Sequence, residues 1–130
     1  GAVGIEAISR GAREALFIEK SAGNRKIIRH NLNLCRMDNN TMIGGDLFKI
    51  AKSLGQSQEK FDIVYADPPF QENWLKRTYH AVINNKLLAR QGILLIEHHY
   101  KDPGRKYLED HIIREKKTGQ TVVSMFRSDS

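Results

Sequence analysis

The chain has 130 residues, of which 40% are hydrophobic, and this is enough for one globular domain with one core. The formal net charge is +6, and such a basic balance suits a polyanionic partner such as nucleic acid. The longest strongly apolar stretch, residues 93–96, is far too short to span a membrane, and no secretory signal is visible. Cys35 is the only cysteine, which excludes an intrachain disulfide and fits a reducing, cytoplasmic location.

Strands and helices are predicted to alternate along most of the chain. The apolar patterns indicate helices over 2–10, 46–54 and 74–88, with a further helix after the N-cap candidate Ser21. They indicate strands over 14–19, 41–43, 61–66, 92–97, 112–117 and 121–126. Alternation implies a mostly parallel sheet, and the last two strands form an antiparallel hairpin around residues 118–120. We therefore expect a doubly wound α/β fold.

The first residues predict an incomplete sheet. Gly1 and Gly4 belong to a segment typical of the end of a glycine-rich turn that enters a helix. The strand that should precede such a turn is absent, so the sheet is expected to have a gap at its centre. We expect residues 1–130 to be a single domain, N-terminally incomplete, from the later part of a longer protein.

The tetrapeptide Asp67-Pro68-Pro69-Phe70 is the most informative motif. It directly follows the apolar run 61–66, which is typical of a buried strand. Neither proline can donate to a sheet ladder, so the strand must stop there, and the corner that results is stiff. Ligands of open α/β sheets bind at the carboxyl ends of the strands. A plain proline-stiffened turn is the alternative interpretation of the same four residues.

These motifs together resemble a known family. Residues 1–12 resemble the start of the first helix in class I S-adenosylmethionine-dependent methyltransferases, and the closest likeness is to the bacterial small-subunit rRNA guanine-N2 methyltransferases. Residues 17–20, 45–47, 67–70 and 119–121 resemble later motifs of that family in the same order. The resemblance implies a Rossmann-like methyltransferase sheet and S-adenosylmethionine as cofactor. No metal is expected, because the chain has no cluster of residues with metal-ligand spacing. It also implies ribosomal RNA as the substrate, either free or within an assembling small subunit.

The resemblance also implies residues that bind the cofactor. Gly1 and Gly4 match the end of its glycine loop, and Glu19, followed by Lys20, matches the acid of the second strand. An acid about 20 residues beyond the glycine turn accepts hydrogen bonds from ribose hydroxyls in dinucleotide-type folds. A simple ion pair with Lys20 is the alternative role for Glu19.

Asp46 and Leu47 match the position where the family contacts adenine. Asp46 would accept a hydrogen bond from the amino group, and Leu47 would lie beside the ring. A helix N-cap is the alternative role for Asp46, and the two roles are compatible.

The resemblance assigns catalysis to Asp67, Pro68, Pro69 and Phe70. The lone pair of an aromatic amine is delocalised, so the amine must be held in line with the methyl donor. The Asp67 carboxylate and the Pro68 carbonyl could accept its two N–H bonds, Pro69 would stiffen the corner, and Phe70 could stack on the base.

Two other functions fit the same residues. DNA amino-methyltransferases also use a proline-rich acidic motif. A non-catalytic RNA-binding domain with the methyltransferase fold is the third possibility, because the upstream half of the cofactor motif is missing. The adjacent pair His98 and His99 is a poor metal site, since neighbouring residues of a strand point to opposite faces, and we expect the pair at the rim of the pocket or against RNA.

Overall fold

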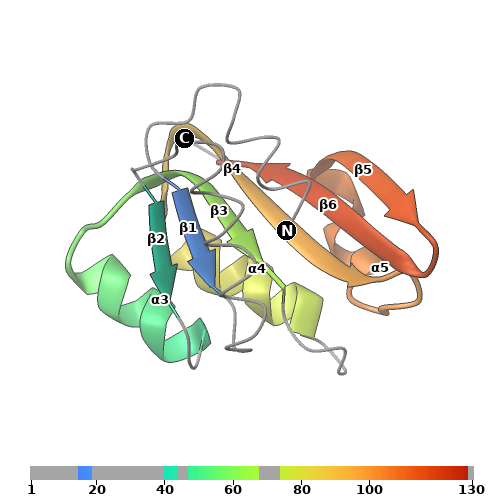
Figure 1. Ribbon diagram of the computed structural model, residues 1–130, viewed down its shortest axis with the longest axis horizontal. Helices are drawn as coiled ribbons and strands as arrows, with labels where there is room; N and C mark the ends of the chain where they lie inside the picture. The colour runs from blue at the N-terminus through green and yellow to red at the C-terminus, as the bar shows by residue number, and fades with distance from the viewer. Residues whose placement is uncertain (1–14, 19–39, 44–46, 68–73, 129–130) are drawn as a thin grey trace.

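The computed structural model describes residues 15–18, 40–43, 47–67 and 74–128 (Figure 1). The strands are β1 (Ala15–Ile18), β2 (Asn40–Ile43), β3 (Phe61–Ala66), β4 (Leu88–His99), β5 (Ile112–Thr118) and β6 (Thr121–Arg127). The helices are α3 (Leu47–Gln56), α4 (Trp74–Asn84), the short α5 (Arg105–Leu108) and a 3-10 turn, η1 (Glu109–His111). The helices expected over 2–10 and after Ser21 lie outside the described residues. No helix in the described part of the chain is long and apolar enough to cross a membrane.

The strands form one mixed sheet in the order β2-β1-β3-β4-β6-β5. The first four strands in this order are parallel, whereas β6 pairs antiparallel with both β4 and β5. Helices α3 and α4 follow β2 and β3 and cover one face of the sheet (Figure 1). The predicted fold class, a doubly wound α/β sheet with a C-terminal antiparallel hairpin, is confirmed.

The expected gap at the centre of the sheet is wrong. Strand β1 pairs directly with β3 in parallel, with Ala15 opposite Ile63 and Ile18 opposite Ala66. Two strands separated by an open space would each leave a row of backbone N–H and C=O groups unpaired, and direct pairing satisfies both rows. The order in which successive strands are added therefore reverses here, because β2 lies on one side of β1 and β3 lies on the other. This makes the junction of β1 and β3 the topological switch point of the sheet.

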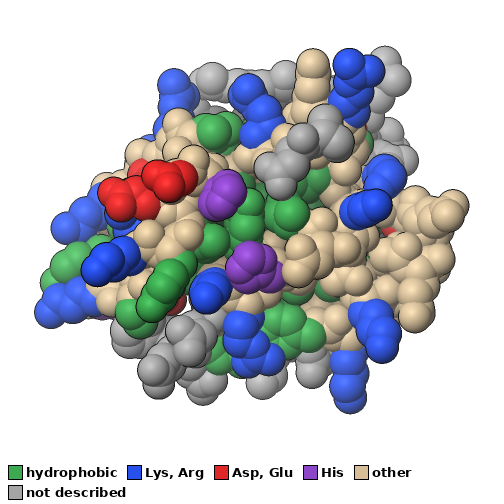
Figure 2. Space-filling model, turned by 180° about the vertical axis from the view of Figure 1, so that it is seen from behind, with side chains coloured by type: hydrophobic (Ala, Val, Ile, Leu, Met, Phe, Trp, Pro, Cys, Tyr) green, Lys and Arg blue, Asp and Glu red, His purple; other side chains and the backbone are tan. Residues whose placement is uncertain are grey.

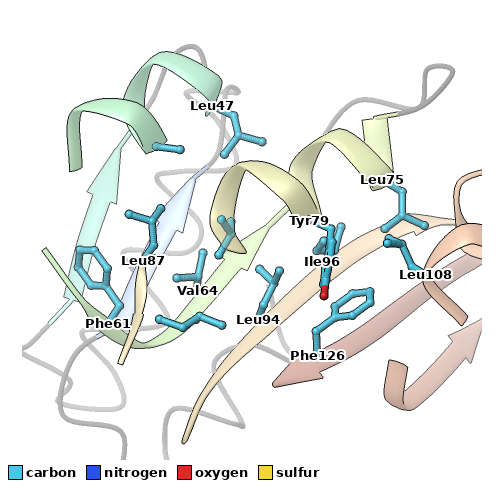
Figure 3. Close-up of a cluster of buried hydrophobic side chains, with 13 residues drawn as sticks. Leu47, Phe61, Val64, Leu75, Tyr79, Leu87, Leu94, Ile96, Leu108 and Phe126 are labelled. Carbon is cyan, nitrogen blue, oxygen red and sulfur yellow. The ribbon is translucent and has the colours of Figure 1, made fainter. Parts of the chain in front are cut away.

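The core lies between the sheet and the helices (Figure 3). Strand β3 is buried along almost its whole length, as expected for a central strand of an α/β sheet. Val64 in β3, Leu75 and Val82 in α4 and Phe126 in β6 are fully buried. Each such side chain contributes about 1.5–3 kcal/mol relative to exposure, so α4 is fixed firmly against β3, β4 and β6.

Helix α4 ends four residues earlier than the predicted 74–88, at Asn84. Lys86 adopts a left-handed conformation with φ of 54°. The N–H of Lys86 donates to the carbonyl of Ile83, and the N–H of Leu87 donates to the carbonyl of Val82. These two bonds make a Schellman cap, in which the buried Leu87 is the usual hydrophobic residue after the cap. The apolar pair at 87–88 therefore leaves the helix and opens β4, which is longer than the predicted strand 92–97.

Candidate functional site

The parallel strands end in a row. In the sheet register Ile18 lies opposite Ala66, and Ala66 lies opposite Ile96. The next residue is Asp67 after β3 and Glu97 in β4, so both carboxylates lie at the carboxyl edge of neighbouring strands. We call this the strand-end row, and it lies next to the switch point between β1 and β3. This is the place where ligands bind in open α/β sheets.

Asp67 is half-buried at the position where β3 stops. Its place directly after a central, buried strand agrees with the sequence expectation. The next three motif residues, Pro68, Pro69 and Phe70, lie outside the described residues. Helix α4 begins at Trp74, so the segment after Asp67 leads from the strand-end row to the first turn of a helix.

A hydrogen bond within the sheet holds Glu97 at this row. The Tyr65 hydroxyl donates to Glu97 Oε2. Tyr65 lies opposite Leu95 in the register, so Tyr65 and Glu97 are diagonal neighbours on one face. Tyr65 is almost completely buried, and its ring therefore gives Glu97 a rigid anchor. This pair was not expected from the sequence, although Tyr65 lies two residues before Asp67 and Glu97 ends the predicted strand.

The two adjacent histidines have different surroundings, and the expectation that both lie at the pocket rim is wrong for His98. His98 is buried, and its Nε2 lies 2.7 Å from the hydroxyl of the fully buried Ser124 in β6. Ile96 lies two residues before His98 in β4, so the two side chains point to the same face of the sheet. Ile96, which lies opposite Ser124, packs in the core on the helix-covered face, and His98 therefore faces the core too. His99 points the other way, and its ring stacks on Tyr100 at 4.8 Å between centroids. His98 therefore joins β4 to β6, whereas His99 lies on the face of β4 that carries Glu97.

Among the residues expected to bind the cofactor, only Leu47 is described. It is the first residue of α3, and its side chain is 7% exposed and packs in the core cluster. Only a small edge of Leu47 can therefore contact a ligand. The other residues expected to bind the cofactor lie outside the described residues: Gly1, Gly4, Glu19, Lys20 and Asp46.

An ion-pair cluster lies beyond the end of β4. Arg105 Nη2 lies 2.8 Å from Glu115 Oε1, and Arg105 Nη1 lies 3.7 Å from Glu109 Oε1. The hydrogen bond to Glu115 is the largest cause that raises the pKa of the Arg105 guanidinium above its usual value. Arg105 is therefore a cation with two carboxylate partners, and the cluster connects α5 to β5.

Comparison with known proteins adds to this geometry. A family model described as conserved hypothetical protein 95 matches residues 1–127. The chain belongs to this family. Its sequence is 26% identical to ribosomal RNA small subunit methyltransferase D of Escherichia coli K12 over 135 aligned residues. That alignment covers all of this chain and 65% of the relative, so the chain spans about two thirds of that relative's length.

Solved structures show the same fold. The Escherichia coli protein yhhF matches with a TM-score of 0.68 and 25% identity, covering all of this chain and 71% of that protein. The N-methyltransferase NodS from Bradyrhizobium japonicum, in complex with S-adenosyl-L-homocysteine, matches with a TM-score of 0.55. It is 15% identical, and the match covers 98% of this chain and 84% of NodS, so this second likeness concerns the fold alone.

Proposed function

We propose that this member of the family takes part in S-adenosylmethionine-dependent methyl transfer to an exocyclic base amine. The proposed acceptor is guanine N2 of small-subunit rRNA. The observation that carries the proposal is the position of Asp67 at the strand-end row, directly before Pro68-Pro69-Phe70 and beside the switch point. The name of the Escherichia coli relative, a small-subunit rRNA methyltransferase, supports the acceptor class.

The fit of the cofactor rests on the chemistry of the strand-end row. The row lies at the switch point, the usual place for a nucleotide-like ligand, and besides Asp67 it presents the carboxylate of Glu97. Carboxylates accept hydrogen bonds from hydroxyl and amino groups, which such a ligand carries. S-adenosylmethionine, when bound, would supply the sulfonium methyl group. Gly1, Gly4, Glu19, Lys20, Asp46 and Leu47 are the residues proposed to hold it.

Asp67 and the prolines would prepare the amine for attack. The carboxylate accepts one N–H bond of the amine, and the Pro68 carbonyl accepts the other. This arrangement favours a pyramidal nitrogen with an available lone pair. Because Pro68 and Pro69 restrict the backbone, little reorganisation is needed during the reaction. Phe70 stacks on the flipped base and keeps it in place.

A methylation assay with a radiolabelled methyl donor tests the proposal. The acceptors are free small-subunit rRNA, partly assembled small subunits, large-subunit particles and duplex DNA. We expect label in the small-subunit acceptors, on guanine N2 after nuclease digestion. Label mainly in duplex DNA would replace the proposal with a DNA amino-methyltransferase. Calorimetric titration with S-adenosylmethionine tests the non-catalytic alternative, and absence of both binding and labelling would contradict the proposal.

A further inference from the structure

Aromatic rings paired with cations form an arc along the carboxyl edge of the fold. We define the aromatic arc as the rings of Phe48 in α3, Trp74 in α4, Tyr107 in α5 and Tyr100 after β4. Phe48 and Trp74 lie 5.2 Å apart, and the Arg77 guanidinium lies 4.2 Å from the first centroid and 5.3 Å from the second. Lys76 Nζ lies 4.5 Å from the Tyr107 centroid. Tyr100 has Lys117 Nζ at 4.4 Å and Lys101 Nζ at 5.5 Å.

Two hollows join these rings into one surface. A groove of about 830 Å³ is lined by Phe48, Arg77, Lys76 and Tyr107 among other residues, and its lining contains no acidic residue. A second hollow of about 360 Å³ extends from Tyr107 to Tyr100. Tyr107 lines both hollows and is 67% exposed, the most exposed of the large hydrophobic side chains that the structure describes. The arc is therefore continuous from α3 to the end of β4.

The charge of this surface is suited to a polyanion. Figure 2 shows the helix-covered face, where Lys and Arg side chains are spread widely and acidic side chains gather mainly at one side. The second hollow does contain the carboxylates of Asp102 and Glu109. Asp102 accepts a hydrogen bond from the Gly104 N–H, and Glu109 is paired with Arg105. The two ion pairs made by Arg105 do not involve Lys76 or Arg77.

The arc lies beside the candidate site. Phe48 and Trp74 belong to the first turns of the helices that follow β2 and β3, and Tyr100 directly follows β4. All three positions are at the carboxyl edge that carries Asp67. A strand of nucleic acid that places one base at Asp67 can therefore continue over these rings.

We propose that the aromatic arc binds the unpaired RNA nucleotides that flank the target base. Tyr107 and Tyr100 stack on bases, and Lys76, Arg77 and Lys117 contact phosphates. Proteins that bind single strands combine basic grooves with aromatic platforms in this way. The assignment rests on the proposed function for the identity of the nucleic acid, but binding requires no methyl transfer.

Fluorescence anisotropy with a labelled single-stranded RNA of about 16 nucleotides tests the arc. The titration contains no methyl donor, so its result is separate from that of the methylation assay. We expect Tyr107→Ala to raise Kd about 5- to 150-fold, whereas Tyr107→Phe, which keeps the ring, stays within about twofold. The double variant Lys76→Ala/Arg77→Ala should reduce the slope of log K against log salt by about 1.4, or about 0.7 for each lost phosphate contact.

The matched control is Lys60→Ala/Arg90→Ala. It removes the same charge from exposed positions at the opposite, amino edge of β3 and β4. We expect it to keep both the affinity and the salt slope. Equal losses in the control and in the Lys76/Arg77 variant would overturn the proposal. Unchanged binding by Tyr107→Ala, or displacement by duplex DNA as effective as by single-stranded RNA, would also overturn it. Absence of RNA binding by the unsubstituted chain would likewise overturn it.

Discussion

The register between β3 and β4 brings the carboxylates of Asp67 and Glu97 to the same edge of the sheet. They are 30 positions apart in the sequence, and parallel pairing of β3 with β4 brings both carboxylates to one edge. Tyr65 fixes Glu97 through its hydroxyl, so the carboxylate is anchored by a buried ring. A carboxylate with a fixed direction needs little reorganisation when a ligand with N–H or O–H groups arrives.

Asp67→Ala should separate chemistry from cofactor binding. The side chain is proposed to hold the acceptor amine, so its loss should lower turnover about 100- to 1,000-fold while the affinity for S-adenosylmethionine stays within about threefold. Single-turnover methylation and calorimetry measure the two quantities. Glu59→Gln is the control, because Glu59 is an exposed carboxylate in the loop at the amino edge, before β3. Turnover of Asp67→Ala equal to that of this control would remove Asp67 from the mechanism.

Individual elements show what can be predicted from the sequence. The bounds of β3 match the prediction, because a run of apolar residues ended by two prolines has few alternatives. The C-terminal hairpin was also predicted, since Gly119 supplies the positive φ of the turn, 63°. The end of α4 was not predicted, because Leu87 and Leu88 continue the apolar period of the helix. The turn chemistry of Asn84 and Asn85 was the signal that could have shown it.

The candidate site was predictable to a smaller extent. The position of Asp67 at a strand end follows from the local pattern alone. The Tyr65–Glu97 and His98–Ser124 pairs depend on strand order and register, which a single sequence does not specify. The arc depends on how α5 packs beside α4. Gly104 allows this approach, because a Cβ on it would lie 3.2 Å from the backbone nitrogen of Lys76.

Lys86→Gly should stabilise the end of α4. The left-handed conformation costs an L-residue about 1–2 kcal/mol, and glycine avoids this cost. Glycine also has greater entropy in the unfolded state, which cancels about 0.5–1 kcal/mol of the gain in stability. We therefore expect a gain of up to about 1.5 kcal/mol in the free energy of unfolding, measured by urea denaturation. The hydrogen bond from Lys60 Nζ to the Lys86 carbonyl uses the backbone and is kept. Lys52→Gly, the same change inside α3, should cost about 1 kcal/mol, and stabilisation by both variants would contradict the explanation.

At the scale of the whole molecule, the pairing of β1 with β3 determines where the site lies. Direct pairing of β1 with β3 makes β3 a central strand and places the switch point beside Asp67. The sheet then continues through β4 into the antiparallel hairpin (Figure 1). The residues of the arc belong to elements that begin or end at the same carboxyl edge. The strand-end row and the proposed RNA surface are thus two parts of one edge. An opening between β1 and β3 would separate the end of β1 from Asp67.

Hydrogen–deuterium exchange tests the pairing of β1 with β3. In a parallel strand, successive N–H groups point alternately to the two neighbouring strands, so β3 needs both β1 and β4 to protect all of its amides. We expect the amides from Ile63 to Ala66 to exchange as slowly as those of Leu94 to Ile96 in β4, which lies between β3 and β6. Exposed β5, which among the described strands pairs with β6 alone, supplies the internal reference for an edge strand. An alternating pattern in β3, with every second amide exchanging as fast as the unpaired amides of β5, would show that β1 does not close the sheet.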